Sequence, residues 1–327
     1  MKKSLYLFLV FAVVAVSGCV GGGDIFQGLV GGGEPEAQTP DIIVMKSFNV
    51  VPKPPVQANN EFSIVFDVLN QNSVQSIRDA NIRLFDWGAC SPDVINFLPD
   101  GWIEDTTRGT ITKTFDELAP NQVERIELKF TAPDNEKIGY IPATCNVKWS
   151  VDYKFSARSS DDFTVISKTR QQELQRSGET VTAVDNPQQL GIGPVSIVFD
   201  FKTPVPVSSK GSIQFSVKAV DRGKGLFASV KAGSFYVKVP KSWTSTSSQP
   251  CTDKFSLVGE EGGNNVWISA KDIPLIKRES QEVVCRFNAP DLDAEDIPER
   301  SYALSSNITD YMYSLQTEQS VRVEPTA

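Results

Sequence analysis

The 327-residue sequence contains no histidine, and this absence removes a large part of the common catalytic repertoire. Without histidine there is no Ser-His-Asp or Cys-His nucleophilic pair, no histidine general base and no histidine-ligated zinc or iron. The Gly-x-Ser-x-Gly and Ser-x-x-Lys signatures of serine acyl transfer are also missing. The five cysteines include no Cys-x-x-Cys pair, the spacing typical of a zinc site. We therefore expect no enzyme of these classes and no cofactor.

The sequence also lacks any run of basic residues. It has 32 Lys and Arg against 40 Asp and Glu, so nucleic acid is a poor partner for the chain. A glycosidase needs only two carboxylates, and 40 acidic residues do not exclude one. Because nothing in the sequence singles out a pair, a carboxylate-based surface hydrolase is the least favoured interpretation.

The first 19 residues have the pattern of a processed export signal. Lys2 and Lys3 precede an apolar run at 5–16, whose helix would be ~18 Å long and too short for ~30 Å of hydrocarbon. The following Val-Ser-Gly-Cys at 16–19 resembles the lipobox of bacterial and archaeal lipoproteins. That resemblance implies removal of residues 1–18 and lipid attachment at Cys19. An ordinary signal peptide with an accidental cysteine is the alternative.

Residues 19–40 are rich in glycine, then in proline and acidic residues, and have no sustained apolar period. Such a segment predicts a flexible tether with a mean reach of ~25 Å. We expect the protein to be exported and held by lipid on the outer face of the membrane.

The remaining chain consists of short apolar-alternating segments. In residues 145–155, odd-numbered positions are apolar and even-numbered positions are polar, a period of two that is typical of a half-buried antiparallel strand. The pattern predicts about seven strands in residues 41–166, the last at 163–166. A polar connector is expected at 167–191, with a short helix at 169–176.

Residues 192–325 repeat this order. Phe-x-Ala-Pro-Asp ends a strand at 130–134 and again at 287–291, and an acidic loop and a tyrosine-bearing strand follow each copy. In the second copy the alternation changes phase at Thr309-Asp310, which predicts a β-bulge. A last strand is expected at 320–323. The fold class predicted is all-β, with two tandem antiparallel immunoglobulin-like β-sandwiches.

These features resemble a known group of modules. The resemblance is based on four motifs: the Asn-rich strand end at 70–72, the Leu-Ala-Pro-Asn-Gln turn at 118–122, the two Phe-x-Ala-Pro-Asp strand ends and the late tyrosine-bearing strand. Together they look like the cell-adhesion-related (CARDB) and NEW-type sandwich domains of archaeal and bacterial surface proteins, over residues 41–166 and 192–324. The resemblance implies a spacer or contact module that is normally without catalysis.

Four cysteines remain after Cys19, two in each predicted sandwich, and a non-cytosolic compartment permits disulfides between them. We predict the pairs Cys90–Cys145 and Cys251–Cys285. The chain-entropy model gives ~4 kcal/mol of stabilisation for each. Four buried free thiols, or one of the other two connectivities, are the alternatives.

Three further groups of residues are candidates for metal binding, glycosylation or sugar contact. Asp291, Asp293 and Glu295 could supply oxygen ligands for calcium, although a solvated acidic turn is the favoured interpretation. Asn307 heads the one glycosylation sequon and lies on the outward phase of its strand. Trp102 and Trp267 border irregular segments, where partial burial is favoured over an exposed surface for sugars.

The function predicted is a lipid-anchored surface protein that serves as a non-catalytic binding, adhesion or envelope-structural module. Its partners would be the membrane, through the anchor, and other envelope proteins or glycans. The alternative is an accessory lipoprotein that captures a solute or glycan for a transporter or envelope enzyme. That alternative requires a pocket with converging polar groups.

Overall fold

A computed structural model describes residues 41–92, 101–105, 108–179, 188–189, 193–245, 247–251 and 254–326. The predicted signal peptide, Cys19 and the tether lie outside these residues. The described chain is all-β, and its antiparallel sheets form sandwich layers, which confirms the predicted fold class. Residues Pro40–Ala327 form one compact unit. None of the described helices is long and apolar enough to cross a membrane.

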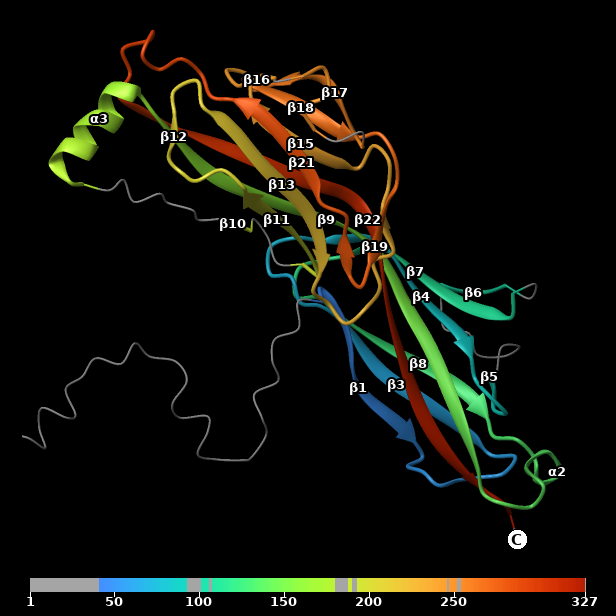
Figure 1. The fold of residues 1–327 in the computed structure, drawn as a ribbon. Helices are drawn as coiled ribbons and strands as arrows, with labels where there is room; N and C mark the ends of the chain where they lie inside the picture. Colours follow the sequence, from blue (N-terminus) through green and yellow to red (C-terminus); the bar gives the residue numbers. More distant parts are fainter. Residues whose placement is uncertain are drawn as a thin grey trace, which may run out of the picture. The chain divides into compact units, whose positions relative to one another are not determined.

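Two long strands form the centre of the fold. β9 (Ala143–Ile166) has 24 residues, β22 (Glu299–Glu324) has 26, and they pair antiparallel along almost their whole length. The expected strands at 163–166 and 320–323 are therefore the ends of β9 and β22 and not separate strands. The last third of β22 pairs with the beginning of β9, so the end of the chain completes a sheet of the first half, residues 41–166 (Figure 1).

The predicted bulge in β22 is confirmed. Ile308 pairs with Ala157 and Tyr311 pairs with Phe155, so two residues of β22 lie opposite one of β9. Asp310 has a positive φ of 49° there. Side chains alternate between the two faces of a strand, so the extra residue places Tyr311 and Tyr313 on the buried face of β22. The neighbouring strand β9 has no bulge, and its buried positions alternate without a break.

β9 and β22 lie in the middle of the largest described sheet, here called the central sheet, and three further strands follow on each side. Its order is β17-β18-β15-β22-β9-β4-β7-β6. The flanking strands are β4 (Ile77–Asp86), β7 (Thr110–Leu118), β6 (Trp102–Asp105), β15 (Phe235–Pro240), β18 (Asn264–Ser269) and β17 (Phe255–Glu261). Short strands add to it: β2 (Val56–Gln57) on β22, and β10 (Gln188–Gln189) and β12 (Val207–Ser208) on β9.

A smaller sheet covers each half of the central sheet. In the first half it consists of β1 (Ile43–Val51), β3 (Glu61–Asn70), β8 (Val123–Thr131) and β5 (Ser91–Pro92). In the second half it consists of β11 (Val195–Phe201), β13 (Ser212–Asp221), β21 (Val283–Asn288), β16 (Thr244–Ser245), β20 (Glu279–Ser280), β19 (Ile273–Ile276) and β14 (Ser229–Val230).

Aromatic side chains fill the space between the layers. In the first half, Trp149 stacks on Phe66 and Phe48, with ring centroids 4.9 and 5.6 Å apart. In the second half, Phe163 of β9 packs against Phe201 and Trp243, with ring centroids 4.8 and 5.2 Å away. The single strand β9 therefore contributes to the hydrophobic core in both halves of the chain.

A buried polar cluster, here called the junction, connects residues that lie far apart in the sequence. The Tyr313 hydroxyl lies 3.1 Å from Asp41 Oδ1 and 3.3 Å from Asp221 Oδ1, and it accepts a hydrogen bond from the Gly225 N–H at 2.8 Å. Arg278 forms an ion pair with Asp221 at 3.0 Å. Both carboxylates and the tyrosine are at most 5% exposed. The junction joins the start of the described chain to β22 and to the loop after β13.

Two short helices of the described chain lie outside the sheets. α3 (Lys168–Ser177) confirms the helix expected in the polar connector. It begins where the Ser167 side chain accepts a hydrogen bond from the Arg170 N–H, and it ends at Gly178 with a φ of 71°, a conformation that glycine adopts easily. α2 (Asn135–Ile138) occupies the first acidic loop, where Asp134 caps it in the same way.

Candidate ligand-binding site

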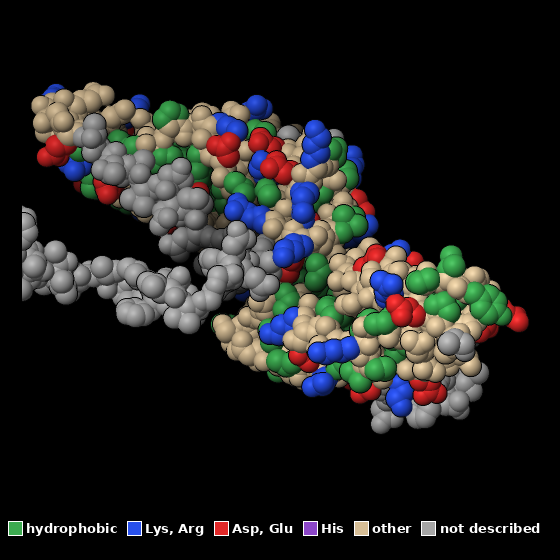
Figure 2. Space-filling view, turned by 90° about the horizontal axis from the view of Figure 1, so that it is seen from below, with side chains coloured by type: hydrophobic (Ala, Val, Ile, Leu, Met, Phe, Trp, Pro, Cys, Tyr) green, Lys and Arg blue, Asp and Glu red, His purple; other side chains and the backbone are tan. Residues whose placement is uncertain are grey.

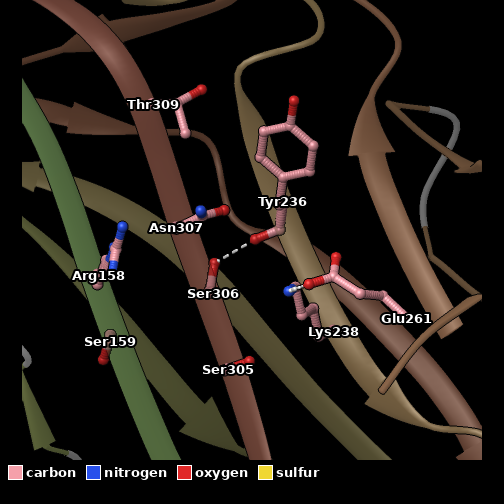
Figure 3. A pocket seen from close by; sticks show the side chains of 9 residues that line it. All are labelled: Arg158, Ser159, Tyr236, Lys238, Glu261, Ser305, Ser306, Asn307 and Thr309. Atoms are coloured by element: carbon pink, nitrogen blue, oxygen red, sulfur yellow. Dashed lines mark hydrogen bonds and ion pairs between the residues drawn. The ribbon is translucent and has the colours of Figure 1, made fainter. Parts of the chain in front are cut away.

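A hollow of about 470 Å³ lies on the outer face of the central sheet, in its second half. Figure 3 shows side chains from β9, β22, β15 and β17 around it. The described residues that line it are Arg158, Ser159, Tyr236, Lys238, Glu261, Ser305, Ser306, Asn307 and Thr309. All but Ser159 and Ser306 are at least partly exposed.

Strand register places the lining side chains in rows. Arg158 of β9 pairs with Asn307 of β22, and Asn307 pairs with Tyr236 of β15, so these three side chains form one row across three strands (Figure 3). Ser305 and Lys238 form part of the next row on the same face. Two strand spacings separate the ends of the first row, roughly 9 to 10 Å. Small side chains at the centre and longer ones at the ends produce the hollow.

Of the three charged side chains that line the hollow, two form an ion pair with each other and the third, Arg158, has no described partner. Lys238 Nζ lies 2.7 Å from Glu261 Oε1, so these two charges neutralise each other. Arg158 forms no ion pair or hydrogen bond with any other residue that the structure describes, and its side chain is exposed. The lining residues therefore carry one uncompensated positive charge at the β9 end of the row.

The central residue of the row has an unsatisfied polar atom. Asn307 Oδ1 is buried and has no hydrogen-bond partner in the described part of the chain. Directly beside it in the sequence, Ser306 Oγ donates to the Tyr236 carbonyl at 2.7 Å and fixes the two strands side by side (Figure 3). A buried acceptor without a donor costs roughly 1–3 kcal/mol, which a ligand donor would offset.

The equivalent position in the first half is closed by its own side chains. There the row consists of Arg83, Ser150 and Gln316. Arg83 lies 3.8 Å from Asp152 and over the Phe85 ring at 5.9 Å, and Ser150 is fully buried. The two halves repeat the same strand order, but of these two rows only the one in the second half combines an arginine without a described ion-pair partner, Arg158, with a partly exposed tyrosine, Tyr236.

Few of the described side chains that line the hollow could act as a general acid or base. Glu261 is the one carboxylate among the described lining residues, and it is held by Lys238. Paired-carboxylate hydrolysis requires two carboxyl groups on either side of the scissile bond. The lining side chains present a guanidinium, a phenol ring, hydroxyls and an amide on strands of one sheet.

The calcium candidates are not gathered around one point. Asp291 pairs with Lys210 at 2.7 Å, Asp293 accepts from the Lys168 N–H at 3.0 Å, and Glu295 pairs with Arg300 at 3.0 Å. The hydrogen bond from Lys210 lowers the pKa of Asp291. Within the described part of the chain, no group of three or more Cys, Asp or Glu side chains could hold a metal ion.

Both predicted disulfides are present. Cys90–Cys145 joins the segment after β4 to the start of β9, and Cys251–Cys285 joins the segment before β17 to β21. All four cysteines are at most 1% exposed. Each disulfide therefore closes a loop within its own half of the chain.

The sequence alone points to one residue of the hollow and not to its neighbours. Asn307 stands out as a sequon, and the structure places it at the centre of the row. Arg158 and Tyr236 carry no such signal, because they are outward residues of strands whose neighbours the sequence does not specify. Trp102 and Trp267, considered for sugar contact, are 7% and 6% exposed, so burial, the favoured interpretation, is confirmed.

The surface around the sheets is mixed in character. On the face shown in Figure 2, Lys and Arg side chains lie in several separate groups beside Asp and Glu, and hydrophobic side chains form small patches.

Comparisons with known proteins give no identity for the chain. No family model matches it, and no curated protein matches it. Among solved structures, similarity is found to a chitinase from Bacillus thuringiensis, with 10% identity, a TM-score of 0.21, and coverage of 76% of this chain and 26% of the chitinase. A protein described as membrane anchored, from Corynebacterium diphtheriae, has 9% identity, a TM-score of 0.24 and coverage of 87% and 92%. Scores this low carry no argument about function.

Proposed function

We propose that this chain is an exported, lipid-anchored envelope protein that acts as a non-catalytic binding and adhesion module. The observation that carries the proposal is the hollow on the outer face of the central sheet. It presents a free guanidinium, a partly exposed tyrosine and an unsatisfied amide on three neighbouring strands. Binding sites commonly combine a few placed polar groups with a ring surface in this way.

Export is supported by the two disulfides, because such bonds persist mainly outside the reducing cytosol. The proposed lipid at Cys19 and the glycine-rich tether would hold the folded body near the membrane surface. Two disulfides also suit a module that bears load, since each is expected to add ~4 kcal/mol of stability.

The absence of catalysis is proposed because the lining residues lack the groups that common hydrolytic mechanisms require. The sequence has no histidine, and the one carboxylate among the described residues of the hollow is neutralised by Lys238. A carboxylate-based hydrolase would need a second carboxyl group facing the first across the bound substrate.

A second candidate function is capture of a free glycan or solute for a transporter or envelope enzyme. It is favoured by the volume of the hollow, about 470 Å³, which lies within the range of ligand pockets. The two candidates share one site and differ in whether the ligand is part of the envelope or diffuses freely.

Fractionation followed by co-sedimentation tests the proposal. The native protein should be found in the membrane fraction, and protease added to intact cells should degrade it. The purified full-length protein should sediment with isolated envelope material from the same cells. If it stays in the supernatant but binds soluble saccharides from the culture medium, the capture function replaces adhesion; if it binds neither, the proposal fails.

A further inference from the structure

We propose that the ligand of the hollow is an acidic saccharide, with a sugar carboxylate on Arg158 and the same or the next sugar ring against Tyr236. This inference rests on the proposed binding function and names its ligand class. It starts from the charge balance: Lys238 and Glu261 cancel, and Arg158 has no counter-charge among the described residues. An anionic group on the ligand would supply that counter-charge.

A carboxylate fits this cation well. The planar guanidinium offers two parallel N–H donors that match the two oxygens of a carboxylate, and this geometry adds both strength and direction. Long polyanions fit less well, because the chain as a whole carries a net charge of -8 and repels them over distance. The attraction must therefore be short-ranged and centred on Arg158, as a single sugar carboxylate allows.

The rest of the row suits a sugar ring. Tyr236 ends the row two strand spacings from Arg158, a distance that one to two pyranose rings can span. The C–H face of a sugar packs on an aromatic ring, while the phenol oxygen stays available for a hydroxyl group. Ser305 and Thr309 add hydroxyls on the same face, above and below the row.

The side-chain oxygen of Asn307 favours a ligand with hydroxyl groups over a simple carboxylic acid, because it needs a hydrogen-bond donor. Its Oδ1 lacks a donor among the described residues. The terminal torsion of asparagine is soft, so the amide can turn its oxygen toward the hollow and accept from a sugar hydroxyl. An acid without hydroxyls would leave this acceptor unsatisfied.

Isothermal titration of the full-length protein in detergent micelles tests the inference, with trigalacturonate as the probe and the neutral galactose trisaccharide as its uncharged match. Trigalacturonate should bind at least tenfold more tightly, a difference of ~1.4 kcal/mol. Arg158→Ala should abolish that preference, and Arg158→Lys should restore only part of it because the ammonium lacks the paired donors. Tyr236→Leu should weaken both saccharides.

Lys154→Ala is the matched control, because Lys154 lies on the same face of β9 and pairs with Asp79 outside the hollow. It should leave the affinity for trigalacturonate within twofold of the wild type. Each variant is checked by thermal melting, so that loss of fold is not mistaken for loss of binding. An equal affinity for the two saccharides, or an unchanged preference in Arg158→Ala, would overturn the inference. So would an N-glycan at Asn307, which would fill the hollow.

The inference and the proposed function fail differently. If the wild type sediments with envelope material and trigalacturonate does not compete, the function stands and the ligand class is wrong. If trigalacturonate binds through Arg158 but no envelope material is retained, the site is right and adhesion is wrong.

Discussion

Removing one hydroxyl at the junction should destabilise the whole described unit. In Tyr313→Phe the Gly225 N–H loses the acceptor that lies 2.8 Å away, and Asp41 and Asp221 lose the hydroxyl that lies 3.1 and 3.3 Å from them. A hydrogen bond to a charged group contributes ~1.5–3 kcal/mol, and an unsatisfied buried donor costs ~1–3 kcal/mol. We expect a loss of about 3 kcal/mol, because the ring itself keeps its packing.

That loss can be converted into a melting temperature. The compact unit spans Pro40–Ala327, so its unfolding entropy is ~0.6 kcal/mol/K, at ~2.1 cal/mol/K per residue. A destabilisation of about 3 kcal/mol then lowers Tm by about 5 °C. Differential scanning calorimetry with both disulfides intact is the appropriate assay.

Tyr140→Phe is the control for this experiment, since Tyr140 is 66% exposed and the same hydroxyl is removed there. Its stability should stay within ~0.5 kcal/mol of the wild type. If Tyr313→Phe behaves like Tyr140→Phe, the junction does not stabilise the fold and the reasoning is refuted.

Three further predictions concern stability. Gly223→Ala should cost at least ~2 kcal/mol in urea unfolding, because the new Cβ would lie 2.1 Å from the Tyr313 hydroxyl and 2.2 Å from Asp41 Oδ1; an unchanged midpoint would contradict the packing described. Replacing either disulfide by two alanines should cost ~4 kcal/mol, and a loss below ~1 kcal/mol would refute the loop-entropy argument. Burial raises the pKa of Tyr153, Tyr311 and Tyr313 above the ordinary value of 10.0. The folded state keeps protons that the unfolded chain releases, so stability is intact below about pH 10 and falls as the pH rises above it. Urea midpoints at pH 9 and 11, with phenolate absorbance, check this; equal midpoints would contradict it.

Alternation of apolar residues predicts the strands well but not their full length. Residues 145–155 are recognisable because bulky apolar side chains mark every second position. The same phase continues through Ala157, Ser159 and Asp161 to Phe163, all of them buried, but the small and polar members hide the pattern. Apolar alternation therefore predicts two strands where the structure has one. It gives no sign that β9 and β22 run through both halves of the chain.

The candidate site could be predicted only in part. The outward position of Asn307 follows from the period of its strand. That Arg158 and Tyr236 lie on either side of it depends on which strands are neighbours and in what register, and alternation within one strand does not contain that information. The disulfide pairs were predictable because each half holds two cysteines at matching or neighbouring strand positions.

Lipid attachment and the two disulfides can be tested together by the intact mass of the protein extracted from membranes, measured with and without reduction and alkylation. We expect a chain that starts at Cys19 and carries lipid, with four cysteines protected from alkylation until they are reduced and with no added glycan. An unlipidated chain in which Cys90, Cys145, Cys251 and Cys285 alkylate at once would rule out both the lipid anchor and export, and would place the protein inside the cell.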